Sequence, residues 1–521
     1  MRFLLVTGQL AKDLVRRHAS RSHVEYDVID MRAPVAALLT AKSVSEALRN
    51  ISQKEYDVIL TPGLIYGDVS LIEETTGVPT FKGPRYAADL PTVLDLYGQV
   101  ELSKVVPACE LLADELRKRA LDEVSAPEKN RSLLLSRPGN LSIGSLTVGI
   151  DFPMRTLAEI VDAPLLSNQE ITDRAQYYID SGADIIDIGM IVGGGRENDA
   201  DRAVRAVKAT FQVPVSIDTI DPVEAKAAVG SGADLILSVD AGNVEEMSTF
   251  ARDVPVVVIP TNHKEGQFPK NSKERVEMMK RNILIARRSG FTHILADLIL
   301  DPIGSPGFVE SIVSFHEFRR IEPELPLFCG IGNVVELLDA DTMGVNALAA
   351  GVASELGISL LLTTEVSDKC RGCVKELATA TKMMFLSKKR GSVPTDLGVD
   401  LLSLKDGRFL EEAYDSACEM GVNELQTCQV HQVSMDPKGC FKIMIDRKVG
   451  KIVAIHYPMH TRDRPDFFVK GETAQEIYRT LIASNLIEDL NHSAYVGYEL
   501  GKAEIALRTG KSYVQDSTLF T

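Results

Sequence analysis

The sequence predicts an α/β protein built around a (β/α)8 TIM barrel, with an N-terminal parallel α/β domain and a C-terminal α+β domain on either side. Three observations predict this fold class. Eight apolar runs alternate with amphipathic helical stretches between residues 142 and 392. That span is close to the ~250 residues of a typical barrel of this kind. The segment Ser181-Gly-Ala-Asp-Ile-Ile also recurs as Ser231-Gly-Ala-Asp-Leu-Ile, which repeats a helix end, a glycine cap and a strand entry.

The expected barrel strands are continuous runs of Ile, Val and Leu, as is typical of strands buried on both faces. We expect these strands at residues 146–151, 184–189, 213–218, 234–239, 255–260, 293–301, 326–331 and 358–363. Helices are expected between them, for example at 170–181, 199–211, 222–230 and 273–289. An open, doubly wound sheet is the alternative that fits the same alternation.

The first flanking region, residues 1–135, alternates short strands and helices. Strands are expected at 3–6, 26–29 and 56–60, and helices near 43–52 and 88–100. Gly8 follows the first strand without a GxGxxG pattern, so no dinucleotide site is predicted. Residues 125–140 are polar and turn-rich and are predicted to be a linker.

The last region, residues 400–521, has a different pattern, in which strands come before helices. A strand pair is expected at 441–445 and 451–457, followed by helices at 472–485 and 489–509. A compact α+β domain is therefore predicted, and a chain of 521 residues has room for about three domains.

Composition and charge exclude several classes of protein. The net charge of -16 argues against nucleic acid or an anionic membrane surface as the main partner, although the cluster of Lys388, Lys389 and Arg390 can still attract a small anion. The N-terminus lacks a signal-peptide pattern, and no run approaches the ~18 apolar residues of a membrane helix. A cytoplasmic protein is therefore expected.

The cysteines do not form the pattern of a secreted disulfide framework. They are Cys109, Cys329, Cys370, Cys373, Cys418, Cys428 and Cys440. A single CxxC pair, Cys370 and Cys373, is a weak signal for zinc, and two buried thiols at a helix start are the expected alternative.

In a TIM barrel, functional side chains lie at the carboxyl ends of the strands and in the loops that follow. The polar residues predicted at these places are Asp151, Asp187, Asp218, Ser238, Asp240, Asn262, His263, Asp297, Asp301, Asn333, Thr364 and Glu365. So many carboxylates at one mouth repel one another unless a divalent metal or a ligand rich in N–H donors is present. Few histidines and no tight ligand spacing favour the second, and no metal is predicted. A pterin ring offers suitable donors.

Several of these residues also have purely structural explanations. Asp187 can cap a turn, Asp218 can cap the helix that begins near Pro222, and Asp301-Pro302 is a turn signal. Asn333 suits a left-handed turn, and His263 suits an exposed loop. The segment Gly193-Gly-Gly-Arg196 can cradle an anion or can be a plain flexible loop.

Residues 142–390 resemble the pterin-binding superfamily of dihydropteroate synthases and methyltetrahydrofolate methyltransferases. The resemblance rests on Gly182-Ala-Asp-Ile-Ile-Asp-Ile-Gly189, Val213-Pro-Val-Ser-Ile-Asp-Thr219, Gly232-Ala-Asp-Leu-Ile-Leu-Ser238 and Leu298-Ile-Leu-Asp-Pro302. It implies that Asp218 contacts the pterin and that Asp301 holds the amino-pyrimidine edge. From their places at expected strand ends and in the glycine loop, Asp151, Asp187, Ser238, Asp240, Asp297 and Arg196 are further cofactor-binding candidates.

The sequence departs from the synthases where these carry cations. Where the synthases have Ser-Arg-Lys after the seventh strand, this chain has Gly332-Asn-Val, and where they have Arg-x-His after the eighth it has Thr363-Thr-Glu365. Such cations stabilise a departing pyrophosphate. Gly330-Ile-Gly-Asn333 instead resembles the methyltransferase branch, which makes Asn333 and Asp218 the candidate catalytic residues.

The three-part arrangement resembles the dihydropteroate synthase-related proteins of methanogens. Residues 491–504 and 513–516 also resemble a module attached to archaeal thymidylate synthases. The resemblance implies a tetrahydropterin cofactor, either tetrahydromethanopterin-like or folate-like, in one-carbon transfer. A corrinoid or another methyl-acceptor protein is a possible partner, as is a second copy of the chain. The alternatives are a synthase that joins a pterin to an arylamine and a non-catalytic pterin carrier.

Overall fold

The computed structural model of the protein forms two compact units, Met1–Leu401 and Leu402–Thr521. The structure describes residues 1–50, 55–304, 307–405, 435–460 and 464–520. Cys418 and Cys428 lie outside the described residues. Within those residues, no helix combines the length and apolar character needed to cross a bilayer. The domain ranges 1–135, 142–392 and 400–521 stay predictions.

The chain begins with a four-stranded parallel sheet in the order β2-β1-β3-β4. Its strands are β1 (Arg2–Gly8), β2 (Glu25–Met31), β3 (Val58–Thr61) and β4 (Thr80–Lys82). Four of the helices that accompany it are α1 (Lys12–Ala19), α2 (Ala41–Ala47), α3 (Ser70–Thr76) and α4 (Leu90–Asp95). Two separate apolar clusters pack against the sheet, since alternate residues of β1 belong to one or the other. The predicted parallel α/β fold is confirmed, with β4 as an additional strand.

The predicted linker at 125–140 is wrong over most of its length, because the chain there is helical. After α5 (Ala108–Leu111), helix α6 runs from Ala113 to Lys129 and α7 from Arg131 to Leu135. Pro127 lies inside α6 and cannot donate a hydrogen bond to the carbonyl of Glu123. Lys389 Nζ donates to that carbonyl at 3.1 Å. The helix therefore tolerates its proline, and α6 packs against α16 of the barrel.

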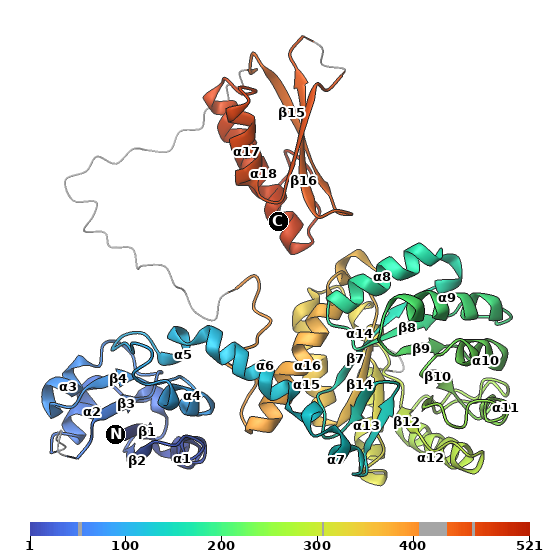
Figure 1. Ribbon diagram of the computed structural model, residues 1–521, viewed down its shortest axis with the longest axis horizontal. Coiled ribbons are helices and arrows are strands. Elements are labelled where there is room, and N and C mark those ends of the chain that lie inside the picture. Colours follow the sequence, from blue (N-terminus) through green and yellow to red (C-terminus); the bar gives the residue numbers. More distant parts are fainter. Residues whose placement is uncertain (51–54, 305–306, 406–434, 461–463, 521) are drawn as a thin grey trace. The chain divides into compact units, whose positions relative to one another are not determined.

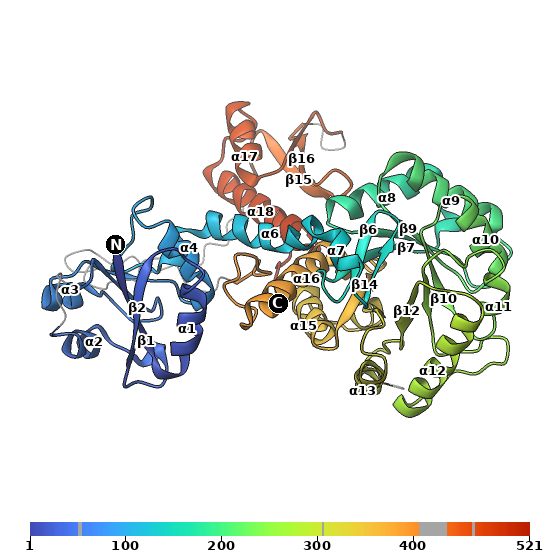
Figure 2. The same ribbon diagram turned by 60° about the horizontal axis from the view of Figure 1, so that its bottom comes forward.

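Among the described residues, eight parallel strands close into the predicted barrel (Figures 1 and 2). The strands are β7 (Arg155–Ile160), β8 (Ile185–Gly189), β9 (Val215–Asp218), β10 (Leu235–Val239), β11 (Val256–Val258), β12 (Ile294–Asp297), β13 (Leu327–Gly330) and β14 (Ile358–Thr363). The helices of this part are α8 (Asn168–Asp180), α9 (Glu197–Thr210), α10 (Pro222–Gly230), α11 (Val244–Met247), α12 (Ser272–Arg288), α13 (Phe308–Ile321), α14 (Gly332–Val335), α15 (Thr342–Glu355) and α16 (Cys373–Arg390).

The first barrel strand is not the one that the sequence predicts. Residues 146–151 fall on β6 (Leu146–Gly149), which forms an antiparallel hairpin with β5 (Asn140–Ile143). Apolar side chains of this hairpin join the inward-facing residues near the start of the barrel strands in one cluster, so the hairpin closes the amino-terminal end of the barrel. The true first strand is β7. Both segments are apolar, and the pattern alone does not distinguish a plug from a strand.

The prediction that Asp151 ends the first barrel strand is therefore wrong. It follows β6 and precedes β7, so it lies toward the end of the barrel opposite the mouth. Its carboxylate accepts a hydrogen bond from Asn140 Nδ2 at 2.7 Å and lies 3.7 Å from the guanidinium of Arg137. Asp151 thus belongs to the hairpin, not to the strand-end carboxylates.

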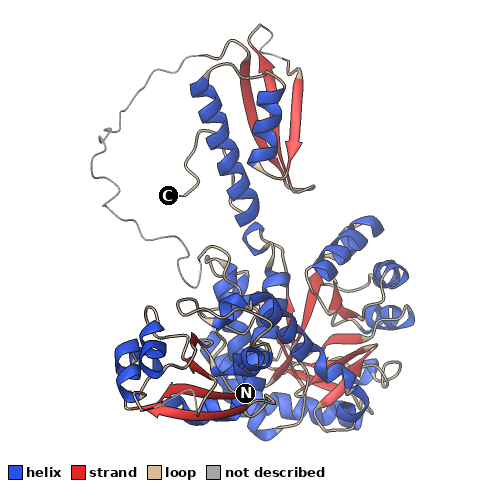
Figure 3. Cartoon of the chain, turned by 60° about the vertical axis from the view of Figure 1, so that its left-hand side comes forward, coloured by secondary structure: helices blue, strands red, loops and turns tan. Residues whose placement is uncertain are grey.

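The second unit contains a three-stranded antiparallel sheet in the order β15-β16-β17, with two helices on one face (Figure 3). Its elements are β15 (Gly439–Asp446), β16 (Lys451–Pro458), β17 (Phe467–Gly471), α17 (Ala474–Ala483) and α18 (Leu490–Thr509). Alternate residues of β15 and β16 pack with both helices in one apolar cluster. The predicted α+β fold is confirmed, with β17 as an additional strand.

Candidate functional site at the barrel mouth

Three carboxylates from successive strands meet at the barrel mouth. Glu159 lies near the end of β7, Asp187 on β8 and Asp218 at the end of β9. One oxygen of each lies within 4.8 Å of one oxygen of the other two. Gly189 makes room for this arrangement, because a Cβ there would lie 2.4 Å from Glu159 Oε1. Glu159 was not among the residues that the sequence singles out, because the first strand was misplaced.

Asp187 is completely buried at the centre of this cluster. Ser216 Oγ donates a hydrogen bond to its Oδ1 at 2.5 Å. Its other oxygen, Oδ2, has no hydrogen-bond partner among the described residues. Burial holds the pKa of Asp187 well above its ordinary value, and the neighbouring carboxyls of Asp218 and Glu159 raise it further. The protein therefore favours the neutral form of this group unless a ligand compensates its charge.

The pKa values of Glu159 and Asp218 are shifted in the same direction as that of Asp187. Burial raises the pKa of Glu159 to about 7, with a further contribution from the charges of Asp218 and Asp162. Burial also raises the pKa of Asp218, and the hydroxyl of Ser238, which donates to Asp218 Oδ1 at 2.6 Å, opposes that shift. Ser238 adopts a left-handed backbone with φ of 61°. Such a conformation is uncommon for a residue other than glycine and is often found at functional sites.

Asp297 supplies a fourth carboxyl from the end of β12. Burial raises its pKa to about 7, although the N–H of Ile299, which donates to Asp297 Oδ1 at 2.8 Å, lowers it. Ile299 is itself strained, with φ of 64° on a β-branched residue. Arg275 holds this turn, because its Nη1 donates to the carbonyl of Ile299 at 2.7 Å. The structure thus builds a strained turn that fixes Asp297.

Asp301 has a different environment from Asp297. Arg275, only 3% exposed, donates from Nη2 to Asp301 Oδ2 at 2.7 Å. Ser311 Oγ donates to the same oxygen at 3.0 Å. The carboxylate of Asp301 is therefore engaged in a buried ion pair, and Asp297 is the residue that ends the sixth strand.

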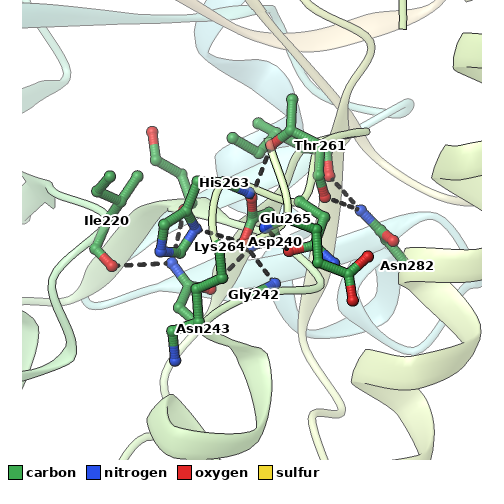
Figure 4. A network of polar contacts seen from close by, with 12 residues as sticks. Ile220, Asp240, Gly242, Asn243, Thr261, His263, Lys264, Glu265 and Asn282 are labelled. Atoms are coloured by element: carbon green, nitrogen blue, oxygen red, sulfur yellow. Dashed lines mark hydrogen bonds and ion pairs between the residues drawn. The ribbon is translucent and has the colours of Figure 1, made fainter. Parts of the chain in front are cut away.

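Asp240 is also buried, but every hydrogen bond it needs is made within the protein (Figure 4). Oδ1 accepts from the N–H of Gly242 at 2.7 Å and contacts His263 Nδ1 at 2.8 Å. Oδ2 accepts from Thr261 Oγ1 at 2.8 Å and from the N–H of His263 at 2.7 Å. Asp240 therefore ties the loop after β10 to the loop after β11, and this explains the place of His263.

Asparagines extend this network to the neighbouring loops. Asn243 Nδ2 donates to the carbonyls of Ile220 and Ser238 at 3.1 and 3.2 Å. Asn282 Nδ2 donates to the carbonyl of Thr261 at 2.9 Å (Figure 4). Asn262 accepts from the N–H of Glu265 at 3.2 Å. These contacts fix the loops after β9, β10 and β11 and hold Ser238 beside Asp218.

Two N–H donors of the glycine loop, those of Gly195 and Arg196, are already taken by protein carboxylates. The N–H of Gly195 donates to Asp221 Oδ2 at 2.8 Å, and that of Arg196 to Glu224 Oε1 at 3.0 Å. The guanidinium of Arg196 is half-exposed and lies 3.6 Å from Asp199. Protein carboxylates thus occupy the positions that an anion would take, as in a structural loop.

The loops after β13 and β14 supply neutral or acidic groups. Asn333 is exposed on α14, and its Nδ2 donates to the carbonyl of Leu300 at 3.0 Å. Glu365 accepts from the Tyr177 hydroxyl at 3.0 Å and from the N–H of Val374 at 2.9 Å. Thr364 donates to Glu336 at 3.1 Å. Neither Asn333 nor Glu365 belongs to the cluster of Glu159, Asp187 and Asp218.

Two further motifs have structural partners. Cys370 and Cys373 are both fully buried before and at the start of α16, which matches the expected pair of buried thiols. Burial raises the pKa of Cys370. In the second unit, His492 Nδ1 lies 2.9 Å from Asp436, and Glu499 pairs with Lys502 at 2.6 Å. The resemblance of this segment to the thymidylate synthase module stays a prediction.

Comparison with known families matches three parts of the chain. Residues 161–344 match the family described as pterin binding enzyme. Residues 435–516 match a family described as PterinBD-DUF4346. Residues 1–85 match a family of unknown function, DUF6513.

Two proteins show the extent of similarity in sequence. An uncharacterized protein of Methanocaldococcus jannaschii is 40% identical over 537 residues, which cover 100% of this chain and 99% of that protein. A Ycf91-like protein of a Nostoc species is 31% identical over 109 residues, which cover 16% of this chain and 85% of that protein.

Solved structures match about half of the chain. The dihydropteroate synthase of Yersinia pestis is 18% identical with a TM-score of 0.38, over 49% of this chain and 100% of that one. The dihydropteroate synthase of Xanthomonas albilineans, in complex with 7,8-dihydropteroate, is 19% identical with a TM-score of 0.38, over 47% and 96%.

Proposed function

Because the chain belongs to the same family as the Methanocaldococcus jannaschii protein, and because its residues 161–344 match the pterin binding enzymes, we propose that it binds a reduced pterin at the barrel mouth. The pterin would serve one-carbon metabolism as a tetrahydropterin, and the reaction would be transfer of a methyl or other one-carbon group.

The observation that carries this proposal is a set of carboxyls at the strand ends that receive few hydrogen bonds from the protein. In the part of the chain that the structure describes, Glu159, Asp187 and Asp218 have no ion-pair partner, and each has a raised pKa. A pterin offers an exocyclic amino group and ring N–H groups on one edge. Carboxylates that accept such donors gain charge-assisted hydrogen bonds in a site from which water is excluded.

We assign the amino-pyrimidine edge to Asp297 and to the pair of Asp218 and Ser238. Asp297 replaces Asp301 in this role, since Asp301 is held by Arg275 at 2.7 Å while Asp297 ends the strand. Asp187 would lie beneath the ring. Asn333 would lie on the side of the ring that carries the one-carbon group, anchored to the carbonyl of Leu300.

One-carbon transfer is favoured over arylamine condensation by the charges around the mouth. Condensation releases pyrophosphate, which needs cations where it departs. The loops after β13 and β14, where the synthases carry cations, have Asn333, Thr364 and Glu365 in this chain, and Arg196 lies beside Asp199. A corrinoid or another methyl acceptor would approach the exposed side of the pterin. A non-catalytic pterin carrier would use the same contacts without an acceptor.

Titration of tetrahydrofolate and 5-methyltetrahydrofolate by anaerobic calorimetry tests this function. Asp297→Asn and Asp218→Asn each remove a charge-assisted hydrogen bond worth about 1.5–3 kcal/mol, so each should weaken binding by about 10-fold to 150-fold. Glu265→Gln, in an exposed loop of the same mouth, is the matched control and should bind like the wild type. Wild-type affinity in both aspartate variants would contradict the assignment.

A further inference from the structure

A cavity opens at the amino-terminal end of the barrel, away from the proposed pterin site. Its volume is about 390 Å³, which lies in the range of ~300–1,000 Å³ that is typical of small-molecule sites. Helices α6 and α16, which lie side by side (Figures 1 and 2), form two of its walls. Met154 lines the cavity just before β7 begins, whereas Glu159 lies near the end of that strand. At about 3.3 Å per residue, the two sites are roughly 16 Å apart along β7.

Most of the cavity wall is apolar. Its larger apolar side chains are Ile150, Phe152, Met154, Ile358 and Phe385. Phe152 is buried and its position is fixed, because its ring lies 5.9 Å from the guanidinium carbon of the buried Arg155. Ile150 is 40% exposed. A ligand with an apolar body gains free energy when it displaces water from such a wall.

The structure divides the basic cluster that the sequence shows at the end of α16. Arg390 is buried, pairs with Glu123 at 3.0 Å and lies 3.8 Å from Asp89. Its charge is therefore committed to the fold. Lys388 and Lys389 are the exposed members of the cluster, and both line the cavity.

The two lysines differ in how firmly they are held. Lys389 Nζ donates to the carbonyl of Glu123 at 3.1 Å and lies 5.7 Å from the centre of the Phe385 ring. That carbonyl is available because Pro127, which also lines the cavity, has no N–H to donate. Lys388 has no ion-pair partner among the residues that the structure describes. The charge of Lys388 is therefore available to an anion.

One carboxylate also lines the cavity, and the protein already balances its charge. Asp151 lies 3.7 Å from the guanidinium of Arg137 and accepts a hydrogen bond from Asn140 Nδ2 at 2.7 Å. The lysines therefore set the sign of the charge at the cavity, in a chain whose net charge is -16.

We propose that this cavity binds a small organic anion with an apolar body, such as an aromatic or aliphatic carboxylate. The anionic head would lie beside Lys388 and Lys389, and the body would pack on Phe152 and Phe385. This combination follows from a wall that is apolar over most of its area and positively charged at one side. The site goes beyond the pterin function and does not depend on it.

Fluorescence of 2-naphthoate, titrated with the full chain, tests this site, because the chain contains no tryptophan to obscure the signal. We expect saturable one-to-one binding that weakens as salt is added, since salt screens exposed charges. 2-Naphthylmethylamine, which has a similar body and the opposite charge, should bind at least about 10-fold more weakly. Decanoate as a competitor separates two kinds of body. Tighter binding than naphthoate indicates an acyl chain, weaker binding indicates a flat ring, and both support the site.

Two changes locate the binding in the cavity. Ser354→Phe, in the last turn of α15, places a ring in the cavity and should weaken naphthoate binding at least about 10-fold. Replacing Lys388 and Lys389 together by glutamine should weaken binding by about 2-fold to 5-fold for each lysine, as expected for exposed ion pairs. Lys375→Gln neutralises an exposed lysine at the other end of the same helix. It is the matched control and should bind like the wild type.

Melting curves separate loss of the site from loss of the fold. The double lysine variant changes two exposed side chains and should melt close to the wild type, so it tests the site even if Ser354→Phe does not fold. The proposal would be overturned by a wild type that shows no saturable binding, by equal binding of the amine, or by wild-type affinity in the lysine variant. None of these titrations involves a pterin, so the proposed function is judged separately.

Discussion

The barrel mouth and the start of the C-terminal sheet each bury an aspartate, and the protein surrounds the two in opposite ways. Asp436 accepts the N–H groups of Lys438, Glu488 and Asp489 and contacts the ring of His492. Although burial alone would raise its pKa, these contacts outweigh burial and lower the pKa to about 2. Asp187 accepts one hydroxyl, and its other oxygen has no donor among the residues that the structure describes.

The difference separates an acid whose charge the fold stabilises with several donors from an acid whose charge the fold leaves with few. Asp436 joins the start of β15 to the start of α18, so its charge is part of the fold. Asp240 at the barrel mouth follows the same rule, with four donors around it. Asp187 departs from it in the same barrel. Burial alone therefore does not mark a site, and the count of donors around the buried charge does.

The largest effect is expected at Asp436. Asp436→Ala leaves three backbone N–H groups without their acceptor and removes the contact to His492. We expect the second unit to lose about 3–5 kcal/mol of stability, as when a buried charged network is broken. Hydrogen exchange of β15 and α18 in the full chain measures this loss. Unchanged protection in these two elements would show that Asp436 is not the anchor.

A smaller change in stability, and of opposite sign, is expected when Asp187 is replaced. Asp187→Asn keeps an acceptor for Ser216 and offers an N–H toward the neighbouring carboxylates. Near pH 8, this change should stabilise the barrel by roughly 1–3 kcal/mol, because folding no longer requires this group either to take up a proton or to be buried with its charge. Denaturant unfolding measures the difference. A destabilised variant would mean that Asp187 is anchored like Asp436, and the contrast between the two would fail.

The pH dependence of stability should show the smallest effect. The pKa values of Glu159 and Asp297 are about 7 in the folded protein, above those of the unfolded chain. The contribution of these two groups to the free energy of unfolding is complete below their pKa values in the unfolded chain. It is lost as the pH rises through about 7, because the folded protein then no longer holds protons that the unfolded chain has released. The melting temperature of the barrel should therefore fall between about pH 5.5 and about pH 8.

Asp297→Asn provides the control for this pH dependence, because it removes one of the two titrating groups and should flatten the fall. The second unit should respond in the opposite direction. Since the pKa of Asp436 is lowered to about 2, its contribution is present above the unfolded value and is lost only as the pH falls toward 2. A melting temperature of the wild-type barrel that does not change with pH would contradict the raised pKa values of Glu159 and Asp297.

Much of the fold could be predicted because parallel strands buried on both faces are unbroken apolar runs. The expected strand 234–239, for example, is Leu235–Val239 in the structure. The aspartates at the ends of such runs, Asp218 and Asp297, were predicted by the same rule. Their surroundings could not be predicted, because Ser238 and Arg275 reach them only in the folded chain.

The strand that carries Glu159 was missed for a physical reason. It begins with Arg155, which is buried because Nε donates to the carbonyl of Thr147 at 2.9 Å and because Glu128 pairs with its guanidinium. These partners come from other elements, so the sequence shows only a charged residue in a short run. The hairpin run at 146–151 is more continuously apolar and took its place. The signal that remained was the second run, Arg155–Ile160, with an acid near its end.

Gly189 and Glu159 constrain each other during evolution. The β-carbon of any other residue at 189 would lie 2.4 Å from the glutamate oxygen and would displace the carboxylate while leaving its charge intact. A change at 189 that comes first should therefore be harmful as long as 159 is a glutamate or glutamine, and the steric conflict is relieved only once the side chain at 159 is short. The order in which the two positions can change is thus directional, with 159 shortened before the glycine is lost.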